Sequence, residues 1–226
     1  MKVGVQKVIL QTPDTRTVRL DRTIDFRAGQ AVKIQFPGDS QGRFFSISSS
    51  PTEKPYLDVT VKAKDGNPLA PILSRLSSGA SVDLDGPFGS FSLPNPIKES
   101  LCFIAAGSGV TVFRSMVHTL LENHASTESW LLHSVKTPAD LIFHDEFVSW
   151  ESSNSKFHYV PTVTQHEGTR WTKETGRIND VLIRKHIADR PCSYLLCGPP
   201  PFVGDMEKLL TGTLRISPGH VRREQW

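Results

Sequence analysis

The run Arg43-Phe44-Phe45-Ser46-Ile47-Ser48-Ser49 places an arginine, two aromatic rings and three hydroxyl groups within seven residues. Alternate side chains of an extended strand point to the same side. A strand of this composition can present a flat ring to a flat ligand and a guanidinium group to a phosphate. The run therefore indicates a ligand that carries both an aromatic ring system and phosphate groups.

A second motif, Ala106-Gly107-Ser108-Gly109-Val110-Thr111, follows the continuous apolar run 101–105. Glycines at this place permit a tight turn and let a phosphate approach the backbone N–H groups at a helix N-terminus. Val112 stands where a Gly-x-Gly-x-x-Gly fingerprint needs its third glycine, and the Gly-Lys-Ser/Thr of a P-loop is absent. A hydrolase elbow is excluded too, because Ala106 and Val110 flank Ser108 where glycines are required.

A third motif, Cys197-Gly198-Pro199-Pro200, ends the apolar run 193–196. Ligands of open α/β sheets bind at the carboxyl ends of the strands. Cys197 at such an end either faces a ligand or is an ordinary buried cysteine before a helix, and the residues alone leave both readings open.

Two patterns of apolar residues separate the elements that must position these motifs. Short period-2 runs with turn residues between them, the first two at Val3–Val5 and Val8–Leu10, predict an antiparallel β-barrel over 1–95, interrupted by one helix over 69–76. From residue 96 to 226 the pattern alternates strand and helix, which predicts a doubly wound parallel α/β sheet. The strands are expected near 101–105, 130–132, 157–160 and 193–197, and helices after Thr111 and near 140–150, 179–188 and 201–211.

Composition narrows the class of protein. A net charge of +3 is too small to indicate nucleic-acid binding, and we find no apolar run of the ~20 residues that span a bilayer. The N-terminal residues lack the apolar core of a signal peptide. Three cysteines have no zinc-ligand spacing and cannot supply the four thiolates of an iron–sulfur cluster. We expect a reducing compartment, cytoplasmic or an organelle matrix, and no metal site.

The order of the motifs resembles the ferredoxin–NADP reductase superfamily. The first run is similar to the family's flavin-binding Arg-x-Tyr-Ser-x-x-Ser, the glycine turn is similar in part to Gly-Gly-x-Gly-Ile-x-Pro, and the third motif matches Cys-Gly-Pro. Gly86-Pro87-Phe88-Gly89 and the terminal Glu224-Gln225-Trp226 also fit the family's order. The chain looks most like the reductase modules of ring-hydroxylating oxygenases, but without their iron–sulfur domain.

The resemblance implies an FAD-dependent oxidoreductase in which hydride passes from NAD(P)H to flavin N5 and electrons leave to a separate acceptor. The barrel would bind FAD through Arg43, Phe44, Phe45, Ser46, Ile47, Ser49, Val61, Lys62, Gly66, Asn67, Pro68 and Leu69. The second domain would bind the nicotinamide nucleotide through Gly107, Ser108, Gly109, Val110, Thr111, Thr164, Gln165, Cys197, Gly198, Pro199 and Pro200. Ser46, Cys197 and Glu224 would be the catalytic residues, and Trp226 would cover the flavin or its adenine.

Two departures from the family bear on the choice of cofactor. Leu69 stands where the family has a serine that helps to hold the diphosphate. This leaves the backbone N–H groups from Asn67 to Ala70, except at Pro68, as the expected donors, and it leaves FMN open as an alternative to FAD. Thr164-Gln165 replaces the Ser-Arg pair of NADPH-specific members, which favours NADH, although Arg170 and Lys173 are close enough in sequence to substitute.

Two other functions fit the same sequence. The chain can be a flavin-containing electron-transfer subunit of a larger complex, with little activity alone. It can also be a binding module that kept the fold without the flavin, which Phe45 and Leu69 would favour. The acceptor, whether protein or small molecule, and the oligomeric state have no signal in the sequence.

Overall fold

The computed structural model describes residues 1–21, 23–64, 66–124, 126–187 and 190–225. The chain forms two compact units. The first comprises Met1–Leu93 together with Thr111–Thr119, and the second comprises Pro94–Val110 together with the residues from Leu120 onward. The expected domain boundary after Asn95 remains a prediction.

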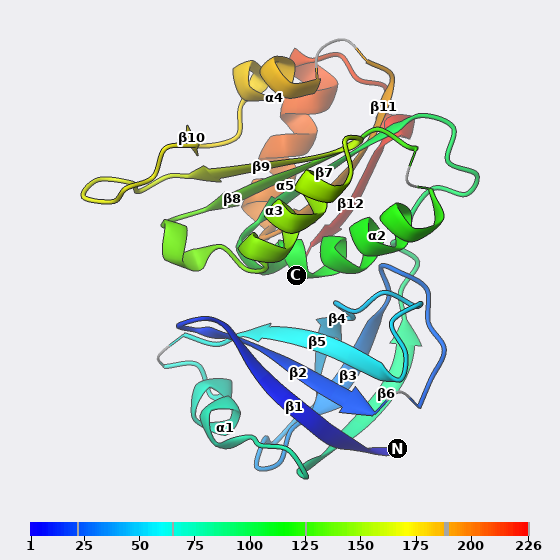
Figure 1. Cartoon of the computed structure of the whole chain (residues 1–226), viewed down its shortest axis with the longest axis vertical. Coiled ribbons are helices and arrows are strands. Elements are labelled where there is room, and N and C mark those ends of the chain that lie inside the picture. Colours follow the sequence, from blue (N-terminus) through cyan, green and yellow to red (C-terminus); the bar gives the residue numbers. More distant parts are fainter. Residues whose placement is uncertain (22, 65, 125, 188–189, 226) are drawn as a thin grey trace. The chain divides into compact units, whose positions relative to one another are not determined.

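The first unit is an antiparallel barrel, as the alternating runs predict (Figure 1). Its strands are β1 (Lys2–Thr12), β2 (Thr15–Asp21), β3 (Ala31–Gln35), β4 (Arg43–Ser46), β5 (Tyr56–Lys62) and β6 (Ser81–Phe88). They lie in the order β4-β3-β6-β1-β2-β5, and a bridge between Ile47 and Val59 joins the two ends of this sheet. The inward side chains form one apolar core that includes Val18, Leu20, Ile34 and Phe36.

One strand differs from the sequence-based expectation. The runs around Val3–Val5 and Val8–Leu10 belong to a single strand, β1, of 11 residues. Its register against β2 shifts between Val5 and Lys7 and again between Leu10 and Thr12. Such irregularities change which side chains face inward without ending the strand, so the interrupted pattern looks like two strands.

Helix α1 (Leu69–Arg75) follows β5, where the helical spacing predicts it. Leu69 and Leu73 are buried, and both belong to the barrel core. The leucine that replaces the family's serine therefore adds apolar contact to this core. The helix ends at Leu76, whose extended backbone directs the chain toward β6.

The second unit is a parallel sheet with helices, as the alternation of strand and helix predicts (Figure 1). Its strand order is β10-β9-β8-β7-β11-β12, and every pairing is parallel. The strands are β7 (Ser100–Ala106), β8 (Ser129–Val135), β9 (Phe157–Val163), β10 (Glu174–Thr175), β11 (Cys192–Gly198) and β12 (Val221–Gln225). The chain runs from β7 outward to β8 and later returns to β11 on the other side of β7. This reversal creates the crevice in which such sheets bind ligands.

The helices of the α/β half are α2 (Val110–Asn123), α3 (His144–Ser153), α4 (Asp180–Ile187) and α5 (Pro200–Lys208). A π-helical turn, Leu209–Thr213, continues α5, so the helix expected to 211 changes its winding after Lys208. Pro200 begins α5, where a missing N–H costs no hydrogen bond. Among the described residues, every helix is too short or too polar to cross a bilayer.

Candidate functional site

The flavin-like run occupies β4 and the residues after it. Arg43 donates from Nε to Asp39 Oδ2 at 3.1 Å, so its guanidinium already has one carboxylate partner. Phe45 packs edge-on against Phe36, with ring centroids 5.8 Å apart, and remains partly exposed. Phe44 points the other way: it is 62% exposed and lies edge-on to Phe88 at 5.5 Å. The alternation of the strand therefore puts Arg43 and Phe45 on one side, as a ring-and-phosphate ligand requires.

The serines of the run divide into two classes. Ser46 is 7% exposed, and within the described part of the chain its hydroxyl makes no hydrogen bond. Ser48 Oγ bonds Thr60 Oγ1 at 2.9 Å and the Asp58 carbonyl at 3.2 Å, and Ser49 Oγ accepts the Asp58 N–H at 3.0 Å. Ser46 is thus the serine whose hydroxyl is available to a ligand, whereas Ser48 and Ser49 tie the run to β5.

A buried ionic network fixes the end of this run. Arg114 donates to the Ser48 carbonyl at 2.8 Å and to both carboxylate oxygens of Glu53, at 3.1 and 3.2 Å. Ser115 Oγ donates to the Ser49 carbonyl at 2.6 Å. Both partners come from Thr111–Thr119, the part of α2 that clusters with the barrel unit. The backbone at Ser48 and Ser49 is therefore held by side chains more than sixty residues away in sequence.

Glu53 is the centre of this network. Its carboxylate also accepts hydrogen bonds from the Ser50 N–H at 2.6 Å and from the Tyr56 hydroxyl at 2.9 Å. His118 Nδ1 lies 3.3 Å from the same carboxylate. Burial by itself would raise the pKa of Glu53, but the close contact with His118 and the hydrogen bonds from Arg114 hold it well below its usual value. The carboxylate is ionised at neutral pH and balances the buried guanidinium.

The remaining predicted flavin contacts lie around the end of β5 and the start of α1. Ile47, Val61 and Leu69 belong to the barrel core, and Lys62 pairs with Asp14 at 3.5 Å. The expected phosphate donors are already used within the turn: the Asn67 N–H bonds the Lys64 carbonyl, the Ala70 N–H bonds the Asn67 carbonyl, and the Leu69 N–H bonds Asn67 Oδ1. The expectation of free N–H donors there is wrong, because the side chain and the carbonyl of Asn67 accept hydrogen bonds from the N–H groups that follow it.

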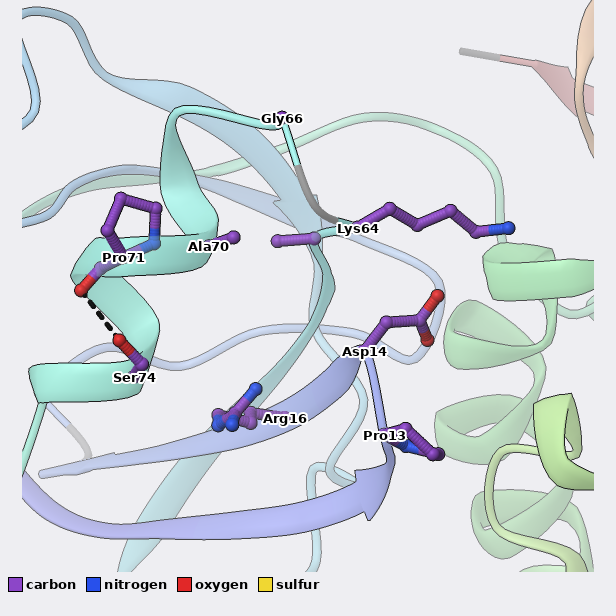
Figure 2. A pocket seen from close by; sticks show the side chains of 9 residues that line it. Pro13, Asp14, Arg16, Lys64, Gly66, Ala70, Pro71 and Ser74 are labelled. Carbon is purple, nitrogen blue, oxygen red and sulfur yellow. Dashed lines mark hydrogen bonds between the residues drawn. The ribbon is translucent and has the colours of Figure 1, made fainter.

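A groove of about 770 Å³ opens beside this turn. Figure 2 shows it between α1 and the hairpin turn that carries Pro13 and Asp14. Arg16 and Lys64 line it, and neither has an ion-pair partner among the described residues. Gly66, a predicted flavin contact, is part of the same wall. The groove therefore offers two available cations next to the loop where the diphosphate is expected.

The glycine turn of the second unit leads from β7 into α2 through one 3₁₀ turn, Gly107–Gly109. Gly107 has a φ of +55°, a conformation that favours glycine. A Cβ on Gly109 would lie 2.3 Å from the Cys197 carbonyl oxygen, so only glycine permits this approach to β11. The Val110 N–H closes the turn onto the carbonyls of Gly107 and Ser108. Val110 and Thr111 are buried, whereas Gly107 and Ser108 are partly exposed.

Cys197 and Glu224 are opposite each other on β11 and β12. Burial, with a smaller contribution from Glu224, raises the pKa of the Cys197 thiol well above its usual value, so the group is a neutral thiol. Glu224 Oε2 is buried without a hydrogen-bond partner within the described residues. Burial raises the pKa of Glu224 to about 7. The pair therefore combines an uncharged sulfur with a carboxyl group that titrates near neutral pH.

The residues predicted beyond this pair are more dispersed. Pro199 and Pro200 are exposed at the start of α5, and Gly198 ends β11. Thr164 and Gln165 are exposed after β9, where their N–H groups bond the carbonyls of Val135 and Lys136. Trp226 lies outside the described residues.

An apolar pocket of about 410 Å³ lies at the same edge of the sheet, between the loops after β8 and β9. It is lined by Thr137, Pro138, Ala139, Thr169, Arg170 and Trp171. Arg170 has no ion-pair partner within the described part of the chain.

Sequence reasoning missed Asp39, Glu53, Arg114 and His133. Asp39 had one available signal, since it precedes Arg43 by four residues in a turn-rich segment. The other three act through contacts across long sequence separations, which neither periodicity nor local motifs reveal.

Comparison with known proteins supports this arrangement. Residues 4–93 match the oxidoreductase FAD-binding domain family, and residues 103–208 match the oxidoreductase NAD-binding domain family. The reductase component of phenol 2-monooxygenase from Pseudomonas sp. (strain CF600) is 30% identical over 82% of this chain and 54% of its own length. Ferredoxin–NADP reductase B of Sorangium cellulosum (strain So ce56) is 28% identical over 89% of this chain and 85% of its own length.

A solved ferredoxin–NADP⁺ reductase from Neisseria gonorrhoeae, with bound FAD and NADP, has the same fold at a TM-score of 0.83 and 22% identity, covering 100% of this chain and 98% of that one. The chain spans about half the length of the first curated relatives it matches. Two matched domain families in this order, with the motif residues at the ends of β4, β7 and β11, place the chain in the ferredoxin–NADP reductase superfamily of oxidoreductases.

Proposed function

We propose that the chain is a flavin-dependent NAD(P)H oxidoreductase that passes electrons to a separate acceptor. The observation that carries this proposal is the buried Glu224 Oε2, which lacks a hydrogen-bond partner within the described residues at the predicted nicotinamide site. The Ser46 hydroxyl is available in the barrel unit, and Glu224 Oε2 lacks a partner beside Cys197 in the α/β unit. A buried polar atom without a partner is rare, so Glu224 Oε2 beside the end of β11 points to a ligand that satisfies it.

The residues fit the two cofactors in different ways. When bound, FAD accepts a hydride from NAD(P)H and releases the electrons to the acceptor. Phe45 presents a partly exposed ring for stacking, and Ser46 offers a hydroxyl within the same strand. Cys197 is fully buried, and burial keeps its proton in place, so the residue at the predicted ring site is a neutral thiol rather than a thiolate. Glu224 holds or releases a proton at its carboxyl group near neutral pH.

The phosphates of the flavin need more positive charge than Arg43 alone provides, because Asp39 already neutralises part of it. Arg16 and Lys64 of the groove in Figure 2 are the available cations beside Gly66. They would take over the role that the family gives to the serine replaced by Leu69. This assignment favours FAD over FMN, because only FAD has a second phosphate and an adenosine that the groove can bind.

The preference between NADH and NADPH depends on the loops after β8 and β9. The exposed Thr164 and Gln165 carry no charge, which favours NADH. Arg170, in the apolar pocket beside them, is the one cation of that pocket. It would have to move onto the 2′-phosphate if NADPH were the donor.

We further propose that the acceptor is another protein. The first relatives are named as reductase components or proteins of phenol and propane oxygenase systems. All three cysteines are free and buried, which fits a reducing compartment such as the cytoplasm or an organelle matrix.

The test is reconstitution of the purified protein with FAD or FMN, followed by anaerobic mixing with NADH or NADPH in a stopped-flow spectrophotometer. We expect tighter binding of FAD, faster bleaching by NADH, and at least tenfold slower bleaching for Ser46→Ala at equal flavin content. A protein that stays colourless with both flavins contradicts the proposal. A protein that is reduced by NADH but transfers electrons only in the presence of a co-purifying partner is instead the electron-transfer subunit of a complex.

A further inference from the structure

The proposed function leaves several buried titratable groups of the α/β unit without a role, and one of them lies against the glycine turn. His133, on β8, is fully buried and lies next to the glycine turn. Its Nε2 is 3.0 Å from the Gly107 carbonyl oxygen, and its Nδ1 is 3.4 Å from the Tyr159 hydroxyl. An imidazole between a hydroxyl and the carbonyl of a ligand-binding turn is well placed to fix that turn.

The hydrogen-bond partners determine the tautomer of His133. The Gly107 carbonyl can only accept, so Nε2 carries the proton that the 3.0 Å contact requires. On the other side of the ring, Nδ1 has the Tyr159 hydroxyl as its partner at 3.4 Å. Burial raises the pKa of Tyr159 well above its usual value, so this hydroxyl keeps its proton.

Tyr159 is itself held in place. It is 4% exposed on β9, its ring lies 5.1 Å from the ring of Phe147 on α3, and its hydroxyl is 3.5 Å from His144 Nδ1. Burial, and the nearby Lys173, lower the pKa of His144, so it too is uncharged at neutral pH. A chain of side-chain contacts therefore leads from His144 of α3 through Tyr159 to His133.

The glycine turn is thus held on two sides. On one side Gly109 packs directly on the Cys197 carbonyl of β11, an approach that depends on the absence of a side chain. On the other side the Gly107 carbonyl accepts from His133 of β8 in addition to the Val110 N–H. The strands β8 and β11 flank β7, from which the turn begins. Of these two restraints, the packing at Gly109 is steric, whereas the contact from His133 is a side-chain hydrogen bond.

We propose that His133 is a positioning residue for the nicotinamide nucleotide, acting through its Nε2 hydrogen bond to the Gly107 carbonyl. This inference rests on the proposed function. Fixing that carbonyl sets the peptide plane between Gly107 and Ser108, and with it the direction of the N–H group that faces the nucleotide phosphates. Glycine at φ +55° has many alternative conformations, so the turn needs an external restraint to hold one of them.

The experiment compares two amide substitutions of the same residue. In His133→Gln the side-chain amide nitrogen reaches the position of Nε2, whereas in His133→Asn it stops near the position of Nδ1 and cannot reach Gly107. Dissociation constants for NAD⁺ and for ADP-ribose, which lacks the nicotinamide, are measured by calorimetry on the oxidised, flavin-loaded protein. We expect His133→Asn to weaken both ligands about tenfold, the typical effect of losing one hydrogen bond. His133→Gln should stay within threefold of the wild type.

Leu132→Ala is the matched control, because Leu132 is fully buried on the same strand and its side chain points to the opposite face of the sheet from that of His133. It should lower the melting temperature but leave both dissociation constants within twofold. The flavin spectrum should be unchanged in all three variants. Equal binding by the Asn and Gln variants, or an equal loss of binding in Leu132→Ala, would overturn the proposal.

Wild-type protein that takes up FAD but binds neither ADP-ribose nor NAD⁺ contradicts both this inference and the proposed function. Wild-type protein that binds them while His133→Asn binds equally well contradicts only the role of His133. If His133→Asn does not fold, Tyr159→Phe replaces it. That variant removes the hydroxyl that orients the imidazole, and a loss of two- to fourfold in ADP-ribose affinity is expected, whereas unchanged affinity would refute the role.

Discussion

The two ligand-binding segments of this molecule are held in place by different physical means. In the barrel unit, the run from Arg43 to Ser49 is fixed by charged and hydroxyl side chains that converge on its backbone, above all Arg114 and Glu53. In the α/β unit, the turn Gly107–Gly109 is fixed by close backbone packing and one imidazole. The first segment should therefore be sensitive to the removal of charge, and the second to the addition of volume.

Removal of the buried guanidinium should have the largest effect. Arg114→Met leaves the Glu53 carboxylate buried with fewer partners, and we expect a loss of about 3–4 kcal/mol in the free energy of unfolding. Urea denaturation of the flavin-loaded protein measures it. Arg19→Met is the matched control: its bidentate partner Asp58 is even more buried than Glu53, but Arg19 itself is 25% exposed, and we expect a loss of about 1–2 kcal/mol. Equal losses from the two substitutions would show that the network around Glu53 has no special weight.

A single methyl group should break the second segment. Gly109→Ala places a Cβ 2.3 Å from the Cys197 carbonyl oxygen, so the turn or β11 must move. We expect at least a tenfold weaker binding of NAD⁺, measured by calorimetry. At Gly107 a Cβ would meet no atom within 4 Å. The only cost of Gly107→Ala is therefore the backbone strain of a non-glycine residue at a φ of +55°, about 1 kcal/mol of folding free energy. The comparison fails if Gly107→Ala weakens NAD⁺ binding more than Gly109→Ala.

Glu224 gives the α/β unit its own pH dependence. Burial raises the pKa of Glu224 in the folded protein to about 7, above its ordinary value of 4.5, so the folded state retains a proton that the unfolded state loses. The stabilisation is complete below pH 4.5 and is lost as the pH rises to 7. After allowance for partial exposure to solvent, we expect this to lower the free energy of unfolding by about 1–2 kcal/mol. Glu224→Gln should flatten the stability profile between these pH values, whereas an unchanged slope would place the titration elsewhere.

Substitutions of the two classes of serine should have the smallest effects on stability, and they should separate a structural serine from one that is available to a ligand. Ser48→Ala removes hydrogen bonds to Thr60 and Asp58 and should cost about 1 kcal/mol of stability, with flavin reduction almost unchanged. Ser46→Ala breaks no hydrogen bond within the described residues, so stability should stay within about 0.5 kcal/mol. Thermal unfolding of both variants checks the difference. A stability loss in Ser46→Ala as large as that in Ser48→Ala would contradict the division.

Much of the architecture could be predicted from the sequence because it depends on patterns. Period-2 alternation indicates the barrel, and the continuous apolar runs 101–105 and 193–196 indicate buried parallel strands. The irregular register of β1 was not predictable, since a shift in pairing leaves no mark in the residue types. The motif residues at the ends of β4, β7 and β11 were identified from their types and order.

The contacts that hold those motifs could not be predicted in the same way. Asn67 illustrates the limit: its side chain accepts the Leu69 N–H, so the donors expected for phosphate are consumed locally. Arg114 and Ser115 had no local signal, because the carbonyls they bind are 66 residues away. The types of the residues indicate which groups can react, whereas only the three-dimensional structure shows which of them are already engaged.

The most direct test of the account is an anaerobic titration of the FAD-loaded protein with NADH, followed by absorbance in the visible region. The account predicts that about one equivalent of NADH bleaches the flavin in the wild type. It also predicts that Gly109→Ala retains FAD but requires a large excess of NADH. A flavin that stays oxidised in the wild-type protein with both NADH and NADPH would contradict the central claim that this chain connects a nicotinamide donor to a flavin.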